Sequence, residues 1–219
     1  MVHIDGLDIE WLGHDCFKIK FDDKILYFDP YKINDTEKAD YIFITHEHYD
    51  HCSMEDLLKI IDRKTIIVAA QKCQKDLEKI EPRVKFITWM IPDELTDAGE
   101  INVESVPAYN VNKFSEPGKP FHPKGENRIG FIIKLKGKRL YHAGDTDHIP
   151  EMASLKNIDI AFIPVSGTYV MTPEEAAKAV ILFKPNIAIP MHYGSIVGSK
   201  SDAERFKSLA AGIDVRILG

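Results

Sequence analysis

This sequence has no excess of positive charge. Its 219 residues contain 28 Lys and Arg against 34 Asp and Glu, which gives a formal net charge of −6 at pH 7. A protein that binds nucleic acid usually carries a basic face that contacts the phosphates. The acidic balance therefore argues against nucleic acid as a partner, and we expect a small-molecule ligand or substrate instead.

Cysteine and long hydrophobic runs are scarce. The three cysteines, Cys16, Cys52 and Cys73, form no C-x-x-C pair, so neither a disulfide framework nor a zinc ribbon is indicated. No run of about 18 apolar residues occurs, and the N-terminus lacks the basic and apolar regions of a signal peptide. We expect a cytoplasmic protein without a membrane partner, and the sequence leaves homo-oligomerisation possible.

Linker-like segments are also missing, and the length is sufficient for one substantial core. We therefore predict a single domain over residues 1–219.

In the middle of the chain we predict a helix over 71–80 that stops at Pro82, and strands over 84–88 and 101–106.

The hydrophobic pattern repeats once along the chain. Each half shows a hairpin whose second strand ends near an aspartate, then an apolar strand, a capped helix and a further strand. The hairpins fall at 17–28 and 128–142, the apolar strands at 41–44 and 159–164, and the helices begin at Ser53 and Thr172. Two such units can pack their sheets face to face with the helices outside. The predicted fold is α/β (α+β), a four-layer αββα sandwich built from two similar halves.

In the first helix, the side chains predicted to face the core are Leu57, Leu58, Ile60 and Ile61.

Four metal-type side chains follow the first apolar strand within a few residues. Alternation in an extended segment places His46 and His48 on one side, where they can bind one cation. Asp50 and His51 lie just past the bend and suit a second ion beside the first. The alternative is a solvated polar loop, so further ligands elsewhere in the chain decide between the two interpretations.

Two more strand ends carry such residues. Asp145 follows a glycine at the end of the second hairpin, and its two oxygens can serve one metal each. His192 ends the apolar strand that begins at Ile187 and precedes a Gly-containing turn. Taken alone, the first is an ordinary Gly-Asp turn and the second a structural histidine. Three matching strand ends favour a site for two ions, bridged by Asp145.

Together these motifs resemble a known family. The segments Gly13-His14-Asp-Cys-Phe17, Phe28-Asp29-Pro30, His46-Glu-His48-Tyr-Asp50-His51, His142-Ala-Gly-Asp145-Thr and Pro190-Met-His192-Tyr resemble the metallo-β-lactamase superfamily. They look like its small-hydrolase branch, similar to ascorbate-phosphate lactonases and acylphosphatidylethanolamine phospholipases. The resemblance implies the αββα sandwich of the metallo-β-lactamase type and places a metal-binding histidine at position 192.

The function expected from these residues is metal-dependent hydrolysis. His46 and His48 would hold the first ion, Asp50, His51 and His192 the second, with two Zn²⁺ expected and Mn²⁺, Ni²⁺ or Fe²⁺ as alternatives. A metal-bound water loses its proton near neutral pH and attacks an ester, lactone or phosphodiester. Asp50, His14 and His142 are the further catalytic candidates, the two histidines by orienting ligands or protonating the leaving group.

Two other functions remain open. An iron-dependent oxidoreductase would use a similar site, although the diiron electron-transfer branch typically has Glu where this chain has His48, and it needs an appended flavin domain. A non-catalytic metal-binding sensor module is the other alternative, because one expected ligand is missing.

The missing ligand is the third histidine of the first metal, which the superfamily usually supplies after the strand predicted at 101–106. Here Tyr109 and Asn110 stand in that place, and the long loop over 108–127 carries His122. A loop of this length is a lid or is disordered. Either it folds back to bring His122 to the metal, or Asn110 or Tyr109 faces the metal with water. Four cations in or beside the loop could bind a substrate phosphate or carboxylate, although solvation explains them equally: Lys113, Lys119, Lys124 and Arg128.

Overall fold

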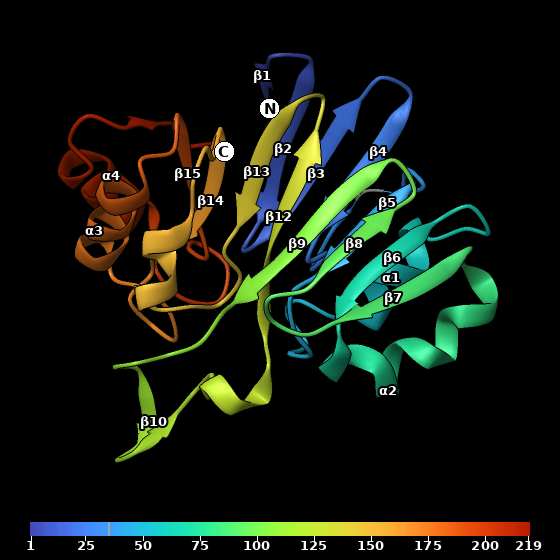
Figure 1. Cartoon of the computed structure of the whole chain (residues 1–219), viewed down its shortest axis with the longest axis horizontal. Coiled ribbons are helices and arrows are strands. Elements are labelled where there is room, and N and C mark those ends of the chain that lie inside the picture. The colour runs from blue at the N-terminus through green and yellow to red at the C-terminus, as the bar shows by residue number, and fades with distance from the viewer. Residues whose placement is uncertain (35) are drawn as a thin grey trace.

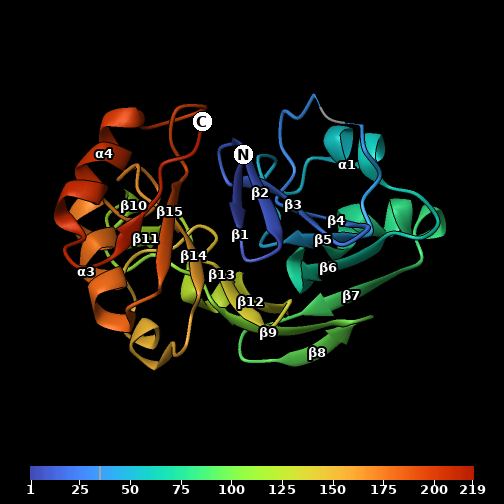
Figure 2. The same ribbon diagram turned by 90° about the horizontal axis from the view of Figure 1, so that it is seen from above.

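The chain folds into two facing β-sheets with helices on the outer faces (Figures 1 and 2). A computed structural model describes residues 1–34 and 36–219. The first sheet has the order β1-β2-β3-β4-β5-β6-β7, with strands Val2–Ile4, Leu7–Gly13, Cys16–Phe21, Lys24–Phe28, Tyr41–Ile44, Ile66–Ala70 and Phe86–Met90. The second has the order β16-β15-β14-β13-β12-β9-β8, with strands Asp214–Val215, Ile187–Met191, Ile160–Pro164, Lys138–His142, Ile129–Leu135, Ile101–Pro107 and Leu95–Ala98.

The helices form the two outer layers. Helices α1 (Met54–Ile60) and α2 (Gln74–Leu77) lie on the side of the first sheet, and α3 (Pro173–Phe183) and α4 (Lys200–Leu209) on the side of the second (Figure 2). The starts predicted for α1 and α3 are confirmed, since Ser53 and Thr172 cap them through their side chains. The four-layer αββα architecture is therefore confirmed.

The two sheets share one internal plan. In the first, β1 to β4 pair antiparallel and β4 to β7 pair parallel. In the second, β8, β9, β12 and β13 pair antiparallel, and β13 to β16 pair parallel. The repeat found in the sequence is thus a repeat in structure, with the hairpin β3-β4 matching β12-β13 and strand β5 matching β14.

The central parallel strands are buried on both faces. Every residue of β5, β6, β14 and β15 is buried, as expected for strands that lie between a facing sheet and covering helices. Parallel neighbours also end at the same edge of the sheet. The loops that follow β4, β5, β13 and β15 are therefore gathered along one edge of the sandwich.

Two predictions about local structure are wrong in detail. The segment predicted as one helix over 71–80 is a 3₁₀ turn (Gln71–Cys73), then α2, then a second 3₁₀ segment (Glu78–Arg83) that contains Pro82. Proline has no N–H for the helical ladder, and the segment buries few side chains, so little favours a regular α-helix. Leu58 is 42% exposed, because it follows Leu57 by one position and so lies on a different side of α1. Helix α4 and strand β8 were not predicted.

The long loop after β9 is built around a small hairpin. Strands β10 (Phe114–Glu116) and β11 (Lys119–Pro120) pair antiparallel, and a 3₁₀ turn follows at Lys124–Glu126. In Figure 1 this hairpin extends away from the sandwich. The segment after the hairpin returns to the body of the protein, where residue 122 is buried.

Candidate metal centre

One aspartate lies at the centre of the gathered loops. Asp145 follows β13 and is 4% exposed. Its Oδ2 atom lies 3.3 Å from Nε2 of His122 and 3.9 Å from Nε2 of His46. Its Oδ1 atom lies 3.4 Å from Nε2 of His51 and 3.3 Å from Nε2 of His192. The two oxygens of one carboxylate thus face two different pairs of imidazoles.

These separations suit metal ligands. Zinc bonds to nitrogen and oxygen of about 2.0–2.2 Å place two ligands of a tetrahedral ion roughly 3.4 Å apart. The histidine–carboxylate distances are 3.3–3.9 Å, and Nε2 of His46 lies 3.0 Å from Nδ1 of His48. Two groups of donor atoms within 4.8 Å of one another share Asp145: His46, His48 and His122 complete the first, and Asp15, His51 and His192 the second.

Four imidazoles are held with Nε2 toward Asp145 by hydrogen bonds at Nδ1. The Thr45 hydroxyl donates its proton to Asp29 at 2.6 Å, so the Thr45 oxygen accepts a hydrogen bond from Nδ1 of His46 at 3.0 Å. Asp29 accepts from Nδ1 of His51 at 2.8 Å. Nδ1 of His122 lies 2.9 Å from Asn110 Oδ1. Nδ1 of His192 lies 3.0 Å from Ser166 Oγ. Such partners fix the tautomer that leaves the Nε2 lone pair available to a metal.

Unsatisfied polar atoms concentrate at the same point. Among the described residues, eight buried side-chain nitrogen and oxygen atoms lack a hydrogen-bond partner. Five of them belong to these two groups: both oxygens of Asp15, Nε2 of His51, Nε2 of His122 and Oδ1 of Asp145. A sixth, Nδ1 of His14, belongs to a residue beside them. Because unpartnered buried polar atoms are costly, this concentration is what a pair of bound cations would explain.

The structure decides between the two placements of His122. The residue is 1% exposed and faces Asp145, so the loop does fold back. Asn110 is behind it, accepting from its backbone N–H and lying against its Nδ1, both at 2.9 Å. The Tyr109 hydroxyl instead donates to Glu151 at 2.9 Å. His122 is thus placed beside Asp145 and out of solvent, and its role as a metal ligand stays a prediction.

Asp50 and His14, two of the predicted catalytic residues, lie beside the second group of donor atoms. Asp50 lies at the edge of the second group, with its Oδ2 atom 4.0 Å from Nε2 of His51 and 3.1 Å from Nε2 of His14. His14 thus stands behind Asp50, and its ring centre is 4.3 Å from that of His192. Both residues belong to the immediate surroundings of the cluster.

His142, the other histidine predicted to be catalytic, does not line the pocket beside the cluster. It is fully buried, packs against Phe28 and Phe162, and donates from Nε2 to the backbone carbonyl of Asp15 at 2.9 Å. The alternation along β13 sends this side chain into the core between the sheets, away from the loop edge. It is a structural histidine that fixes the turn at Asp15.

Charge at the centre shifts several pKa values. Burial alone would raise the pKa of Asp145, but the imidazoles of His192 and His51 outweigh it and hold that pKa well below its usual range. Burial lowers the pKa of His46 well below its usual value, and burial and the nearby Arg128 lower that of His48 to about 4. His46 and His48 are therefore neutral at pH 7, as metal binding requires.

A pocket opens onto the cluster. It has a volume of about 230 Å³ and is lined by His48, Tyr49, Asp50, Phe121, His122, Asp145, Tyr169 and Ile196. It brings together both halves of the candidate centre, the His122 loop and apolar side chains. A small molecule can therefore reach the space beside Asp145.

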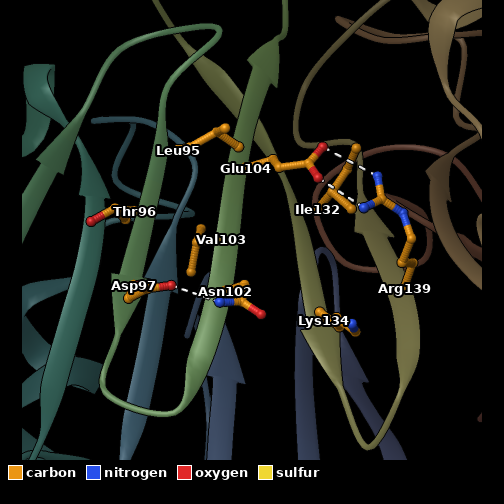
Figure 3. A pocket seen from close by; sticks show the side chains of 9 residues that line it. All are labelled: Leu95, Thr96, Asp97, Asn102, Val103, Glu104, Ile132, Lys134 and Arg139. Carbon is orange, nitrogen blue, oxygen red and sulfur yellow. Dashed lines mark hydrogen bonds and ion pairs between the residues drawn. The ribbon is translucent and has the colours of Figure 1, made fainter.

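A second hollow, of about 370 Å³, lies beside strands β8, β9, β12 and β13 (Figure 3). Its polar side chains largely bond to one another, with two hydrogen bonds from Arg139 to Glu104 at 2.8 and 3.2 Å and one from Asn102 to Asp97 at 2.7 Å. None of its nine lining residues is a histidine or cysteine. The metal-type side chains of the two groups lie at the first pocket instead.

The geometry of the fold and of this cluster defines a class of protein, and comparison with known proteins agrees. Residues 8–192 match the family described as "Beta-lactamase superfamily domain", and the chain belongs to that superfamily. Within it, the chain belongs to the UPF0173 family of metal-dependent hydrolases. It is 34% identical over 208 residues to a UPF0173 protein of Pyrococcus abyssi, and the matched region covers 92% of this chain and 89% of the relative.

Two further relatives extend over nearly the whole length. A UPF0173 metal-dependent hydrolase of Thermoplasma acidophilum is 32% identical over 227 residues, covering 98% of this chain and 96% of the relative. A crystal structure of a protein assigned as a metal-dependent hydrolase, from Parabacteroides distasonis, superimposes with a TM-score of 0.83 at 35% identity, covering 96% and 92% of the two chains. No helix among the described residues is long and apolar enough to cross a membrane.

Sequence reasoning missed Asp15. It is fully buried, and burial raises the pKa of its carboxyl well above the usual range. The available signal was its place directly after His14, at the end of a strand that leads to the site. A single acidic residue in a turn is too common to be assigned from sequence.

Proposed function

We propose that this protein is a hydrolase that uses two adjacent divalent ions, zinc being the first candidate, to cleave an ester or lactone of a small molecule. The observation that carries the proposal is the set of four Nε2 atoms held around the two oxygens of Asp145, each imidazole fixed from behind at Nδ1. His46, His48 and His122 would hold the first ion, and His51, His192 and Asp50 the second, with Asp145 between them.

The protein's own residues would divide the remaining work. Two such ions, when bound, would supply a hydroxide near pH ~7 and would stabilise negative charge that develops on the substrate. Asp50 lines the pocket with a side chain that is 14% exposed, so its carboxylate is placed to accept a hydrogen bond from the attacking water. His14 Nε2, 3.1 Å from Asp50 Oδ2, fixes the orientation of that carboxylate. Leaving-group protonation by His142 is not part of this proposal, because its ring does not reach the pocket.

Apolar side chains in the pocket support an acyl substrate with a small apolar group. Phe121 and Tyr169 meet edge to face with ring centres 4.7 Å apart, and Ile196 also lines the pocket. Burying such a group against aromatic rings contributes about 25 cal/mol per Å² of apolar surface. A neutral ester or lactone fits this lining better than a substrate with several charges.

The cations of the neighbouring loop are engaged by carboxylates. Lys113 pairs with Glu175 at 2.7 Å, Lys124 with Glu151 at 2.7 Å, and Arg128 with Glu47 at 2.6 Å. Lys119, the fourth cation considered from the sequence, is 69% exposed and lies 4.0 Å from Glu116. This pattern does not favour a phosphate-binding role for these side chains, which makes a phosphodiester the second choice.

Metal removal and a substrate panel test the proposal. The protein would be stripped with a chelator, assayed for metal content, and offered p-nitrophenyl esters of increasing acyl length, lactones, and bis-p-nitrophenyl phosphate. We expect turnover of short acyl substrates that is lost on chelation and restored by Zn²⁺ or Mn²⁺. Full activity in chelated protein would exclude the metal mechanism. Two tightly bound ions with no turnover of any substrate would favour the sensor alternative, and metal-dependent oxidation would favour the iron oxidoreductase.

A further inference from the structure

Asp15 is a carboxyl group at the candidate centre that no hydrogen bond explains. It is 0% exposed, and neither carboxylate oxygen has a hydrogen-bond partner. Its carboxylate lies within 4.8 Å of donor atoms of His51, Asp145 and His192. Of these, Nδ1 of His51 is 3.8 Å from its Oδ2 atom. A buried carboxylate without a partner is costly, and a cation compensates it best.

The backbone around Asp15 fixes its direction. His142 donates to the Asp15 carbonyl at 2.9 Å. The preceding carbonyl, of His14, accepts from the backbone N–H of His192 at 3.1 Å and from the Trp11 indole at 2.8 Å. The turn therefore has three anchors, one of them on His192, which itself faces Asp145. Solvent is out of reach of the Asp15 side chain.

The two halves of the centre differ in their donor atoms. One group contains Asp145 with three imidazoles, those of His46, His48 and His122, and no other carboxylate. The other group contains Asp145 with two imidazoles, those of His51 and His192, and the Asp15 carboxylate. Imidazole suits zinc, whereas carboxylate oxygen suits Mn²⁺ and similar hard ions.

We propose that Asp15 is a ligand of the second ion and that its carboxylate gives this position a greater relative preference for Mn²⁺ than the three-histidine position has. The inference rests on the proposed two-metal centre. It adds a ligand to that centre and predicts that the two positions are not equivalent. The ratio of Mn²⁺ affinity to Zn²⁺ affinity would then be higher at the second position than at the first, although Zn²⁺ binds such donors more tightly than Mn²⁺ in absolute terms.

The competing explanation is a proton shared between two carboxyl groups. A neutral Asp15 acid can donate to Asp145 without contacting a metal, and an amide in its place would donate in the same way. Replacing Asp15 with asparagine therefore separates the two explanations. The amide preserves size and hydrogen bonding but removes the anionic oxygen that a metal would bind.

The test is metal binding by full-length protein, without reference to turnover. Metal-free wild type and Asp15→Asn would be titrated with Mn²⁺, followed by the electron paramagnetic resonance signal of free Mn²⁺, and with Zn²⁺ by competition against a chromophoric chelator. We expect the variant to lose roughly 10 to 100-fold in Mn²⁺ affinity at one position, with a smaller loss for Zn²⁺ and no change at the other position. Unchanged Mn²⁺ binding would overturn the proposal.

Asp56→Asn is the matched control, because it replaces another buried aspartate, one that lies at the start of α1 and binds backbone and Lys59 groups. Its metal affinities should equal those of wild type.

If Asp15→Asn fails to fold, a crystal of wild type loaded with Mn²⁺ and measured near the manganese absorption edge replaces the titration. An anomalous peak at bonding distance from an Asp15 oxygen supports the proposal, and a peak bound by the other residues alone overturns it. Failure of wild type to bind any ion would instead contradict the proposed function.

Discussion

Asn110 and His122 are joined by three hydrogen bonds. The Asn110 N–H donates to the His122 carbonyl at 2.8 Å, and Asn110 Oδ1 lies 2.9 Å from both the N–H and Nδ1 of His122. Asn110 is itself held, because its amide nitrogen donates to the Tyr169 carbonyl at 2.7 Å. The segment directly after β9 therefore has no histidine, but it supplies Asn110, which positions His122.

Replacing Asn110 with alanine should weaken one metal position. His122 would keep its nitrogen atoms but lose the acceptor that holds its proton on Nδ1, so the orientation and tautomer of the ring would no longer be fixed. We expect a loss of roughly 10-fold or more in affinity at the first position, as is usual for partners that orient a ligand. Zinc titration measures this loss. Asn112→Ala is the control, since that side chain contacts Glu175 on α3 instead, and an equal loss in both variants would contradict the positioning role.

Removal of the ring itself should have a larger effect. We expect His122→Ala to lower the affinity of the first ion by 10 to 100-fold or more, and to leave the second near normal, because His51 and His192 are untouched. Metal titration of wild type and variant provides the measurement. His3→Ala is the control, as this histidine is 69% exposed and pairs with Asp8 far from the centre. Two unchanged affinities in His122→Ala would remove the residue from the site.

Much of the fold was predictable because apolar patterning and capping are local signals. Strand β5 has four consecutive buried residues, and Thr172 with Glu175 forms a reciprocal cap at α3. The dense motif at His46 to His51 was equally visible. Such features need only neighbours in sequence, so they can be read before the fold is known.

The rest depends on contacts between distant segments. His122 and Asp145 are brought together by a loop whose path no local pattern specifies, and Asp15 is buried by a turn anchored to His142 and His192. His142 shows the opposite case, since it stands beside a metal-type sequence but its side chain packs in the core. In both cases burial and direction, which a sequence does not contain explicitly, decide the role.

Asp145→Ala should abolish metal-dependent activity and reduce the bound metal while the protein stays folded. The carboxylate faces both groups of histidines, so its loss removes one donor from each position. Mutation of groups that act on the metal costs far less in stability than in binding when the core is unchanged. Metal analysis, activity and the melting temperature are the measurements.

The control for Asp145→Ala is Asp23→Ala, at an exposed turn between β3 and β4. It should retain metal and activity. Normal metal content in Asp145→Ala would show that the carboxylate does not bridge the ions. A variant that is largely unfolded would show that the charge cluster contributes to the stability of the metal-free fold.

Asp56 joins helix α1 to the segment after β4. Its carboxylate accepts from the backbone N–H of Lys32 at 2.8 Å and of Ile33 at 3.1 Å, and from Lys59 at 2.8 Å. Burial alone would raise the pKa of Asp56, but hydrogen bonds from Lys59, Ser53 and the backbone outweigh it and leave the pKa below its usual value. The folded protein therefore binds this proton more weakly than the unfolded chain does.

Stability from Asp56 should accordingly be lost in acid. It is fully present above the unfolded pKa of about 3.9 and decreases as pH falls through the lower folded value. We expect Asp56→Asn to reduce the free energy of unfolding at pH 7 by about 1–3 kcal/mol, since buried donors lose a charged acceptor. Urea denaturation at pH 7, 5 and 3 measures the difference, which should be constant between the first two values and smaller at the third. Asp23→Asn, at an exposed position, should show no such difference, and a gap for Asp56→Asn that widens toward pH 3 would contradict the assigned direction.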